Sequence, residues 1–313
     1  MIPVLITIVQ ALAVFAIAPF TFGLVRTCKA RLQGRRGPSP FLPYVSFATL
    51  LKKEMVISTT TSWVFRAVPY VVLGSTMFLA LVLPLFGQGG AFAVYSDFVL
   101  VAAVLAIGAV FLVLGGLDVG SAFGGMGSSR EMTISSLIEP AMIMTFATFA
   151  MVTHTGAIDQ MLATPALISG HPFLIFSVIS LILVALAENA RYPVDNPATH
   201  LELTMVHEAM ILEYSGPYLA MLEYASALKL TIFALLVGNI IAPFTLFTPT
   251  SDFGAFLLAI IGFVVKICLG MGLLALLEST IAKMRFYRMQ EYVSAAFFIA
   301  FLGMALALFT FVL

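Results

Sequence analysis

The chain has 313 residues, of which 61% are hydrophobic and 10% charged, and its formal net charge is zero. A water-soluble protein of this size needs a more polar surface, so the composition excludes a soluble globular fold and indicates a polytopic membrane protein. The neutral balance gives no indication of nucleic-acid binding. The two cysteines, Cys28 and Cys268, are fewer than the four thiolates that usually hold an iron–sulfur cluster, so we expect no cluster in this chain.

Eight apolar runs are long enough to cross the hydrocarbon core of a bilayer, which takes about 20 helical residues. They lie at approximately 3–25, 64–86, 97–117, 131–153, 172–190, 228–247, 253–277 and 290–313. The sequence therefore predicts an all-α protein with eight transmembrane helices, in which residues 1–313 form a single integral membrane domain.

Lysine and arginine lie in alternate connections between these runs, and such residues mark the cytoplasmic side of a membrane protein. The connections 87–96, 154–171 and 248–252 contain neither residue. This separation predicts that both termini lie outside and that the two long loops, 26–63 and 191–227, are cytoplasmic. Lys266, inside the seventh run, is the exception.

The first of these loops is long and basic. Its motif RRGPSPFLP (Arg35–Pro43) contains three prolines and cannot form a continuous helix. Tyr44–Leu51 can form a short amphipathic helix at the interface, where Trp63 also suits an aromatic belt. The basic residues have two interpretations, which are topology with lipid binding and the docking of a partner. The predicted docking residues are Arg35, Arg36, Arg130 and Arg191.

Two carboxylates, Glu131 and Glu139, enter the fourth run, and they lie about 12 Å apart along a helix. Ser135 lies midway between them, and Pro140 removes one backbone hydrogen bond beside Glu139. A carboxyl group inside a membrane is either neutral and packed between helices or part of an ion path. The combination of carboxylates, hydroxyl and loosened backbone favours a proton path, and Lys266 is a candidate partner for Glu139.

The stretch Glu188–Glu223 holds the densest group of ionisable residues in an otherwise apolar chain. Such groups near bilayer depth usually mark an ion path or a substrate site. We predict a helix over Ala198–Glu213, on which Glu202 and Glu213 share a face. Gly216 and Pro217 are expected to end that helix.

Two histidines of this stretch, His200 and His207, raise the question of a metal site. Their separation of seven residues is neither i,i+3 nor i,i+4, and no thiolate lies nearby in the sequence. We therefore predict no metal in this chain.

Several short motifs, taken together and in this order, resemble a known family. The family is the membrane subunit shared by respiratory complex I, as its subunit 1, and the membrane-bound group 4 NiFe hydrogenases, and the formate hydrogenlyase and hydrogenase-4 branch is the most similar. The motifs are RRGP (Arg35–Pro38), GLDVGSAFGGMGSSRE (Gly116–Glu131), EP (Glu139–Pro140), AENARYPVD (Ala187–Asp195), EYSG (Glu213–Gly216), LKL (Leu228–Leu230) and LLESTIAKMR (Leu276–Arg285).

The resemblance implies a subunit of a prokaryotic inner-membrane complex that docks a soluble electron-transfer arm. The implied partners are a hydrogenase-like large subunit, an iron–sulfur small subunit and antiporter-like membrane subunits. The NiFe centre and iron–sulfur clusters would belong to those partners, with no cofactor in this chain. The implied path residues are Glu131, Glu139, Glu188, Asp195, Glu202, Glu213, Lys229 and Glu278, to which we add Lys266 because it lies inside a predicted span.

The chain departs from the family pattern in the acidic loop. Ala198 and His200 stand where the family usually has acidic residues, and Val194 replaces a phenylalanine. Two alternatives therefore stay open beside a hydrogenase-type anchor. One is a quinone-chamber subunit of a complex I-like dehydrogenase. The other is a free-standing secondary transporter, although we find no internal repeat of the kind usual in such proteins.

Overall fold

The structure is a computed structural model of the whole chain, and it describes residues 2–164, 170–191, 193–195, 205–243, 246–248, 253–281 and 286–312. These residues are mostly helical and, within these ranges, form no β-strand. The all-α prediction is therefore confirmed.

Seven helices are long and apolar enough to cross a membrane. They are α1 (Ile2–Leu32), α3 (Trp63–Val82), α4 (Phe98–Asp118), α5 (Ala122–Thr153), α10 (Gly216–Ile241), α11 (Phe253–Thr280) and α12 (Phe286–Val312). The remaining predicted span coincides with α8 (Leu174–Glu188), which is apolar but has only 15 residues. The eight-span count and the outside placement of the termini stay predictions.

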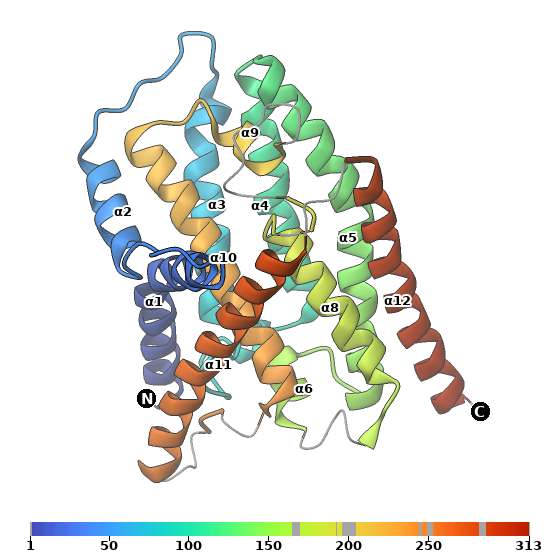
Figure 1. Cartoon of the computed structure of the whole chain (residues 1–313). Coiled ribbons are helices and arrows are strands. Elements are labelled where there is room, and N and C mark those ends of the chain that lie inside the picture. The colour runs from blue at the N-terminus through green and yellow to red at the C-terminus, as the bar shows by residue number, and fades with distance from the viewer. Residues whose placement is uncertain are drawn as a thin grey trace.

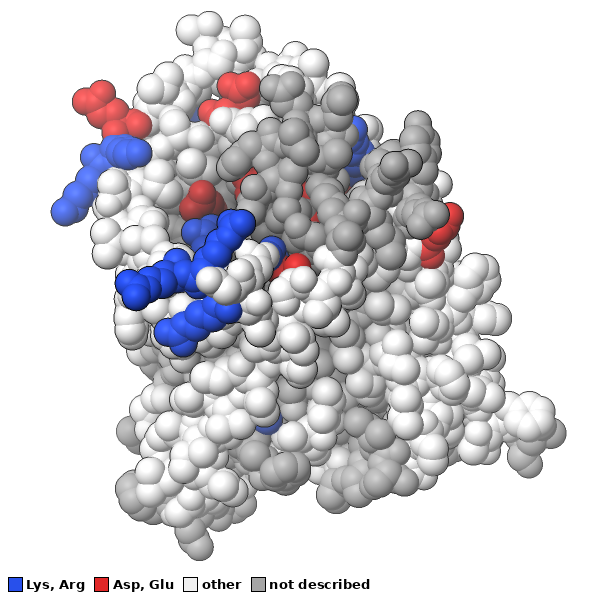
Figure 2. Space-filling model, in the orientation of Figure 1, with Lys and Arg blue, Asp and Glu red and all other residues white. Residues whose placement is uncertain are grey.

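The long helices form one bundle, in which α3, α4 and α5 pack in sequence and α8 and α12 both lie against α5 (Figure 1). Helix α10 packs on α1 and α3, and α11 packs on α1 and α10. Charged side chains gather over the upper part of the molecule in Figure 2, while the lower half of that face is almost uncharged. We call the end with Arg35, Arg36, Lys52 and Lys53 the basic end, and the opposite end the far end.

Three short helices and a 3-10 turn complete the described structure. Helix α2 (Leu42–Lys52) lies against α1 and α10, and it confirms the short helix predicted after the proline-rich motif. Helix α9 (His207–Ile211) packs on α4 and α5 at the basic end. At the far end are η1 (Ala93–Tyr95) and α6 (Ile158–Ala163).

Helix α5 begins nine residues before the start predicted from hydropathy. The Ser121 hydroxyl caps the helix by accepting a hydrogen bond from the Gly124 backbone N–H at 3.1 Å. A Cβ atom on Gly124 would lie 2.2 Å from the carbonyl oxygen of Gly116, so this close approach of α4 and α5 requires glycine. As a result Glu131 lies inside a helix rather than at its mouth.

Helix α10 begins at Gly216, about twelve residues before the predicted sixth span. Gly216 has φ +54°, and Pro217 occupies the first turn of the helix, where its missing N–H costs nothing. The Gly–Pro pair therefore starts a helix, which places Glu223 and Lys229 on one rod. The helix predicted over Ala198–Glu213 is reduced to α9 within the described part, and residues 196–204, including His200 and Glu202, lie outside it.

Candidate functional site

A cavity between six helices of the bundle brings together several ionisable side chains. Its ionisable lining residues are Glu131 from α5, Glu188 from α8, His207 from α9 and Lys229 from α10. Helices α3 and α4 supply small and apolar residues, including Ser75 and Thr76. We call this space the carboxylate cavity.

Glu188 and Lys229 form an ion pair in this cavity. Lys229 Nζ lies 3.2 Å from Glu188 Oε1, and the side chains are 21% and 9% exposed. Burial of either charge alone would cost several kcal/mol, roughly, and pairing offsets much of that cost. Glu131 shares the cavity without belonging to the pair. The site thus holds one neutralised pair and a further carboxyl group.

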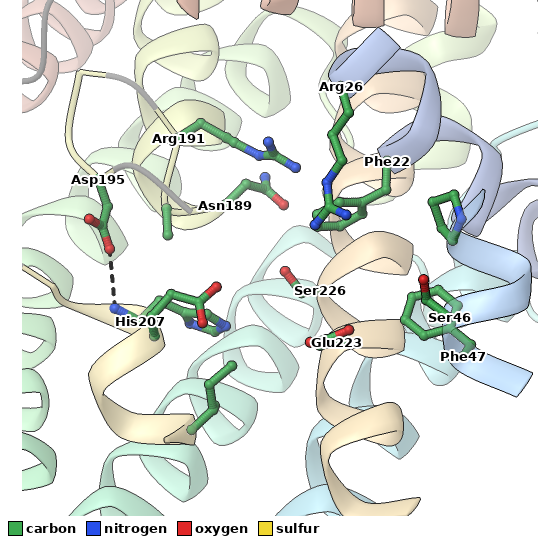
Figure 3. Close-up of a pocket in the computed structure, with 14 residues that line it drawn as sticks. Phe22, Arg26, Ser46, Phe47, Asn189, Arg191, Asp195, His207, Glu223 and Ser226 are labelled. Atoms are coloured by element: carbon green, nitrogen blue, oxygen red, sulfur yellow. Dashed lines mark hydrogen bonds between the residues drawn. The ribbon is translucent and has the colours of Figure 1, made fainter. Parts of the chain in front are cut away.

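A second cavity lies beside the first, at the basic end (Figure 3). Its walls are Phe22 and Arg26 of α1, residues of α2, the segment after α8, and Glu208 and Glu223. We call it the loop cavity. The two cavities share four lining residues, which are Asn189, Ala190, His207 and Ser226. They are therefore separated by single side chains and together reach from the basic end to Glu188 and Lys229.

The shared histidine is held by Asp195. The Asp195 carboxylate is buried and accepts hydrogen bonds from the backbone N–H groups of Val206 and His207, each at 3.2 Å (Figure 3). This cap fixes the start of α9 and directs His207 toward both cavities. Burial, and then the positive charge of Lys229, lower the pKa of His207 to about 4. The imidazole is neutral at pH 7 and can both donate and accept a proton.

The pKa of Glu208, the next residue on α9, is shifted in the opposite direction. Burial raises its pKa from 4.5 to about 7, and the neighbouring Glu223 and Asp195 add to the effect. A carboxyl group with a pKa near 7 exchanges protons readily at neutral pH. Glu208 lines the loop cavity, so the entrance to the pair of cavities carries a group suited to proton uptake.

This raised pKa predicts a pH dependence of stability. The folded protein binds the Glu208 proton more tightly than the unfolded chain does. Protonated Glu208 therefore adds to the free energy of unfolding, and this contribution is fully present below about pH 4.5 and is lost as the pH rises toward 7. In the parent, the free energy of unfolding should decline by about 1–2 kcal/mol between these two pH values, after allowance for the partial exposure of Glu208. We expect Glu208→Gln to abolish this decline. Thermal unfolding in detergent at a series of pH values measures it. The exposed Glu213→Gln is the matched control, and equal slopes for parent and Glu208→Gln would contradict the prediction.

Arg191, which lines the loop cavity, belongs to a group of three charged residues. Glu278 of α11 accepts from Lys29 Nζ at 3.2 Å and from Arg191 Nη1 at 3.3 Å, with its own side chain 2% exposed. The Arg191 guanidinium also lies 4.7 Å from the centre of the Phe22 ring. Glu278 therefore joins α1, α11 and the segment after α8, and this provides a structural reason for the charge at that position.

Three further residues predicted for the path, Glu139, Glu213 and Lys266, line neither cavity. Glu139 is half-buried on α5 but lines neither cavity, and the Glu213 side chain is exposed. Lys266 does not pair with Glu139, because its Nζ donates to Asn239 Oδ1 at 2.7 Å. Glu202 lies outside the described residues.

The predicted docking arginines also divide into two groups. Arg35 and Arg36 are exposed between α1 and α2. Arg191 is buried against Glu278, and Arg130 donates to the Met205 carbonyl at 2.8 Å, so both have partners within the chain. The docking prediction is thereby narrowed to Arg35 and Arg36.

Four ionisable residues of the cavities were not among the predicted path or docking residues, namely Arg26, His207, Glu208 and Glu223. The sequence carried a usable signal for one of them, because Glu223, Ser226 and Lys229 recur every three residues and share one face of a helix. That signal was hidden because the sixth span was placed too late. The roles of His207 and Glu208 depend on the fold of the loop after α8, which periodicity does not show.

Comparisons with known proteins give matches over nearly the whole chain. The family model described as NADH dehydrogenase matches residues 4–311. The chain is 31% identical over 304 residues to formate hydrogenlyase subunit 4 of Escherichia coli (strain K12), covering 96% of this chain and 97% of the relative. It is 30% identical over 286 residues to hydrogenase-4 component C of the same organism, covering 90% and 89%.

A solved structure shows the same fold. It comes from the membrane-bound sulfane sulfur reductase, an archaeal respiratory membrane complex, and it superposes with a TM-score of 0.80. The match covers 97% of this chain and 98% of the other, at 16% sequence identity. This similarity concerns the fold alone.

Proposed function

The chain belongs to the NADH dehydrogenase family, and from this premise we propose that it is the membrane anchor and ion-coupling subunit of a hydrogenase-type redox complex. It docks a soluble electron-transfer arm at the basic end and carries protons from there into the membrane. The relatives named as subunits of formate hydrogenlyase and hydrogenase-4 support this choice, and they argue against a free-standing transporter. The arm would supply the NiFe centre and the iron–sulfur clusters, and antiporter-like subunits would be the membrane neighbours.

The observation that carries the proposal is the junction of the two cavities. Glu208 and Glu223 line the one at the basic end, Glu131, Glu188 and Lys229 line the inner one, and neutral His207 lines both. Protons taken up at Glu208 reach the Glu188–Lys229 pair past a single side chain that can accept and release them. The expected direction is therefore from the docked arm inward, with Glu139 as the next carboxyl group along α5.

Docking of the arm gives a direct test. The complex purified in mild detergent should contain a hydrogenase-like large subunit and an iron–sulfur small subunit. The double reversal Arg35→Glu/Arg36→Glu should release both while this chain stays inserted, because both arginines are exposed beside the predicted docking face. Each exposed contact is worth only about 0–1 kcal/mol, so both must be changed.

The control for this test is Lys52→Glu/Lys53→Glu, which makes the same change of charge at exposed positions of the basic end. This variant should keep the arm at ordinary salt. If both double variants release the arm equally, the basic end attracts the arm through its overall charge, and Arg35 and Arg36 make no specific contact with it. Recovery of the parent chain without any soluble partner would contradict the proposed function.

A second candidate function, quinone reduction, is favoured by two atoms in the loop cavity. Arg191 Nη2 and Asn189 Oδ1 are buried and have no hydrogen-bond partner within the described residues. Both side chains point toward the space beside Phe22 in Figure 3, and they offer one donor and one acceptor to a ligand. A quinone carbonyl would accept from the Arg191 N–H, and the O–H of the reduced quinol would donate to the Asn189 amide oxygen. Reduction of a short-chain quinone by the purified complex, lost in Asn189→Leu, would support this function over the first.

A further inference from the structure

A second polar centre lies in the far half of the bundle, where the chain leaves α3. Residues 83–87 are buried but not helical, so their backbone groups need partners inside the protein. The buried Gln10 side chain donates to the carbonyls of Ala80 and Leu83, and its Oε1 accepts from the N–H groups of residues 85, 86 and 87 at 3.2–3.4 Å. Asn239 Nδ2 donates to the carbonyls of Pro84 and Leu85 at 2.9 and 3.1 Å.

Lys266 adds a charge to this centre. It lies in the middle of α11, about 20 Å along the helix from either end. Its Nζ donates to Asn239 Oδ1 at 2.7 Å, and none of the three ion pairs of the described residues includes it. Its stem passes Gly238, where a Cβ atom would lie 3.3 Å from Lys266 Cβ. The neighbouring helix is therefore shaped to admit this lysine.

The position of Lys266 is not explained by helix packing alone. A lysine at the centre of a membrane helix costs about 2.5–3.5 kcal/mol on insertion scales, and an apolar residue would pack there without that cost. An ammonium group has three N–H donors, and the Asn239 amide oxygen satisfies one of them. Such a residue in a membrane is a candidate for proton relay.

An apolar chamber separates this centre from the carboxylate cavity. Its lining begins at Lys229 and is otherwise apolar, with Leu83, Leu105, Phe146 and Leu236 among the residues. Leu83 is also bonded to Gln10, and Leu236 lies one turn before Asn239 on α10. The chamber therefore reaches from Lys229 of the carboxylate cavity to residues that adjoin the second polar centre. Apolar walls exclude water, and hydrophobic constrictions in channels open by wetting.

We propose that Lys266, with Asn239 and Gln10, is a second proton-transfer site, and that the apolar chamber is a gate between it and the carboxylate cavity. The inference rests on the proposed function, because the carboxylate cavity supplies the protons. The Lys266 ammonium releases a proton toward the far end, which leaves a lone pair on Nζ. When the chamber wets, a proton from the carboxylate cavity arrives along water as hydronium, and an O–H bond of that hydronium breaks as the lone pair of Nζ forms the new N–H bond. This cycle gives the subunit a transfer path of its own.

Access of water to Lys266 can be tested without any assay of turnover. The native cysteines are first changed to alanine, and Lys266→Cys is then exposed to a charged, membrane-impermeant thiol reagent from the far side of vesicles. We expect reaction at least tenfold faster than for Val265→Cys, whose side chain is 45% exposed on the outer face of α11. Equal or absent labelling at 266 would overturn the proposal, because a proton site needs contact with water.

Transport is tested in proteoliposomes with the complete complex, as protons taken up per hydrogen evolved, with subunit content checked by gel. Lys266→Met should lower this ratio at least tenfold, while Val265→Met should keep the parent ratio. Lys266→Arg should be impaired as well, because arginine donates hydrogen bonds but does not release its proton. Full rescue by arginine would show that Lys266 only holds Asn239. Loss in Glu188→Gln without loss in Lys266→Met would leave the proposed function intact and reject this inference, and no loss in either would reject both.

Discussion

Glu188→Gln is expected to lower proton uptake by the reconstituted complex at least tenfold, which corresponds to about 1.4 kcal/mol in the barrier. Glutamine keeps the size of the side chain but neither exchanges a proton nor neutralises Lys229, whose Nζ lies 3.2 Å from the carboxylate. The variant leaves a half-buried cation next to Glu131 in the carboxylate cavity. The measurement is hydrogen turnover and proton uptake in proteoliposomes, with assembly checked by subunit content.

A double-mutant cycle separates the role of the charge pair from that of the carboxyl group. Lys229→Met alone should also lower proton uptake, and the double variant should lose less than the two single effects combined, because no lone charge remains. Glu139→Gln should lower uptake at least tenfold if that residue follows Glu188 in the path. The exposed Glu291→Gln on α12 is the neutral control. Parent-like uptake in Glu188→Gln would contradict the path through the carboxylate cavity.

The helical architecture could be predicted from the sequence because spans are set by local hydropathy. Seven predicted spans coincide with helices of spanning length, and the short helix α2 follows the proline-rich motif as expected. The two largest errors concern helix starts. Hydropathy placed the starts of α5 and α10 at Glu131 and Leu228. In the structure, Ser121 caps α5 and the Gly216–Pro217 pair begins α10, and both positions lie before the apolar run.

The candidate site was predicted less completely, because it depends on lateral neighbours. Glu188 and Lys229 were identified singly, but their pairing depends on the packing of α8 and α10. Lys266 was a candidate partner for Glu139 and instead contacts Asn239, since α11 packs on α1 and α10. The number of charged residues in a segment indicates that a site exists. Which of these residues pair with one another depends on the arrangement of helices in the bundle.

Glu278→Gln is expected to destabilise the protein more than any other single substitution discussed. The Glu278 side chain is 2% exposed and forms ion pairs with both Arg191 and Lys29. Removing one member of a buried ion pair costs about 3–5 kcal/mol, because the remaining charge is left without compensation. Arg191, with 5% of its side chain exposed, carries most of that cost, and its segment leads directly to Asp195 and the cap of α9. Thermal unfolding in detergent should show a clear drop in the midpoint.

Two further variants identify the source of this loss. Lys29→Gln should cost much less, because Lys29 is 21% exposed and water replaces part of the interaction when Glu278 retains Arg191. The double variant Glu278→Gln/Arg191→Met should regain much of the stability of the parent, since it removes the buried guanidinium together with its carboxylate partner. If Glu278→Gln unfolds at the same temperature as the parent, the three charges do not join α1, α11 and the segment after α8. If the double variant is no more stable than Glu278→Gln, the loss comes from packing rather than from the uncompensated guanidinium.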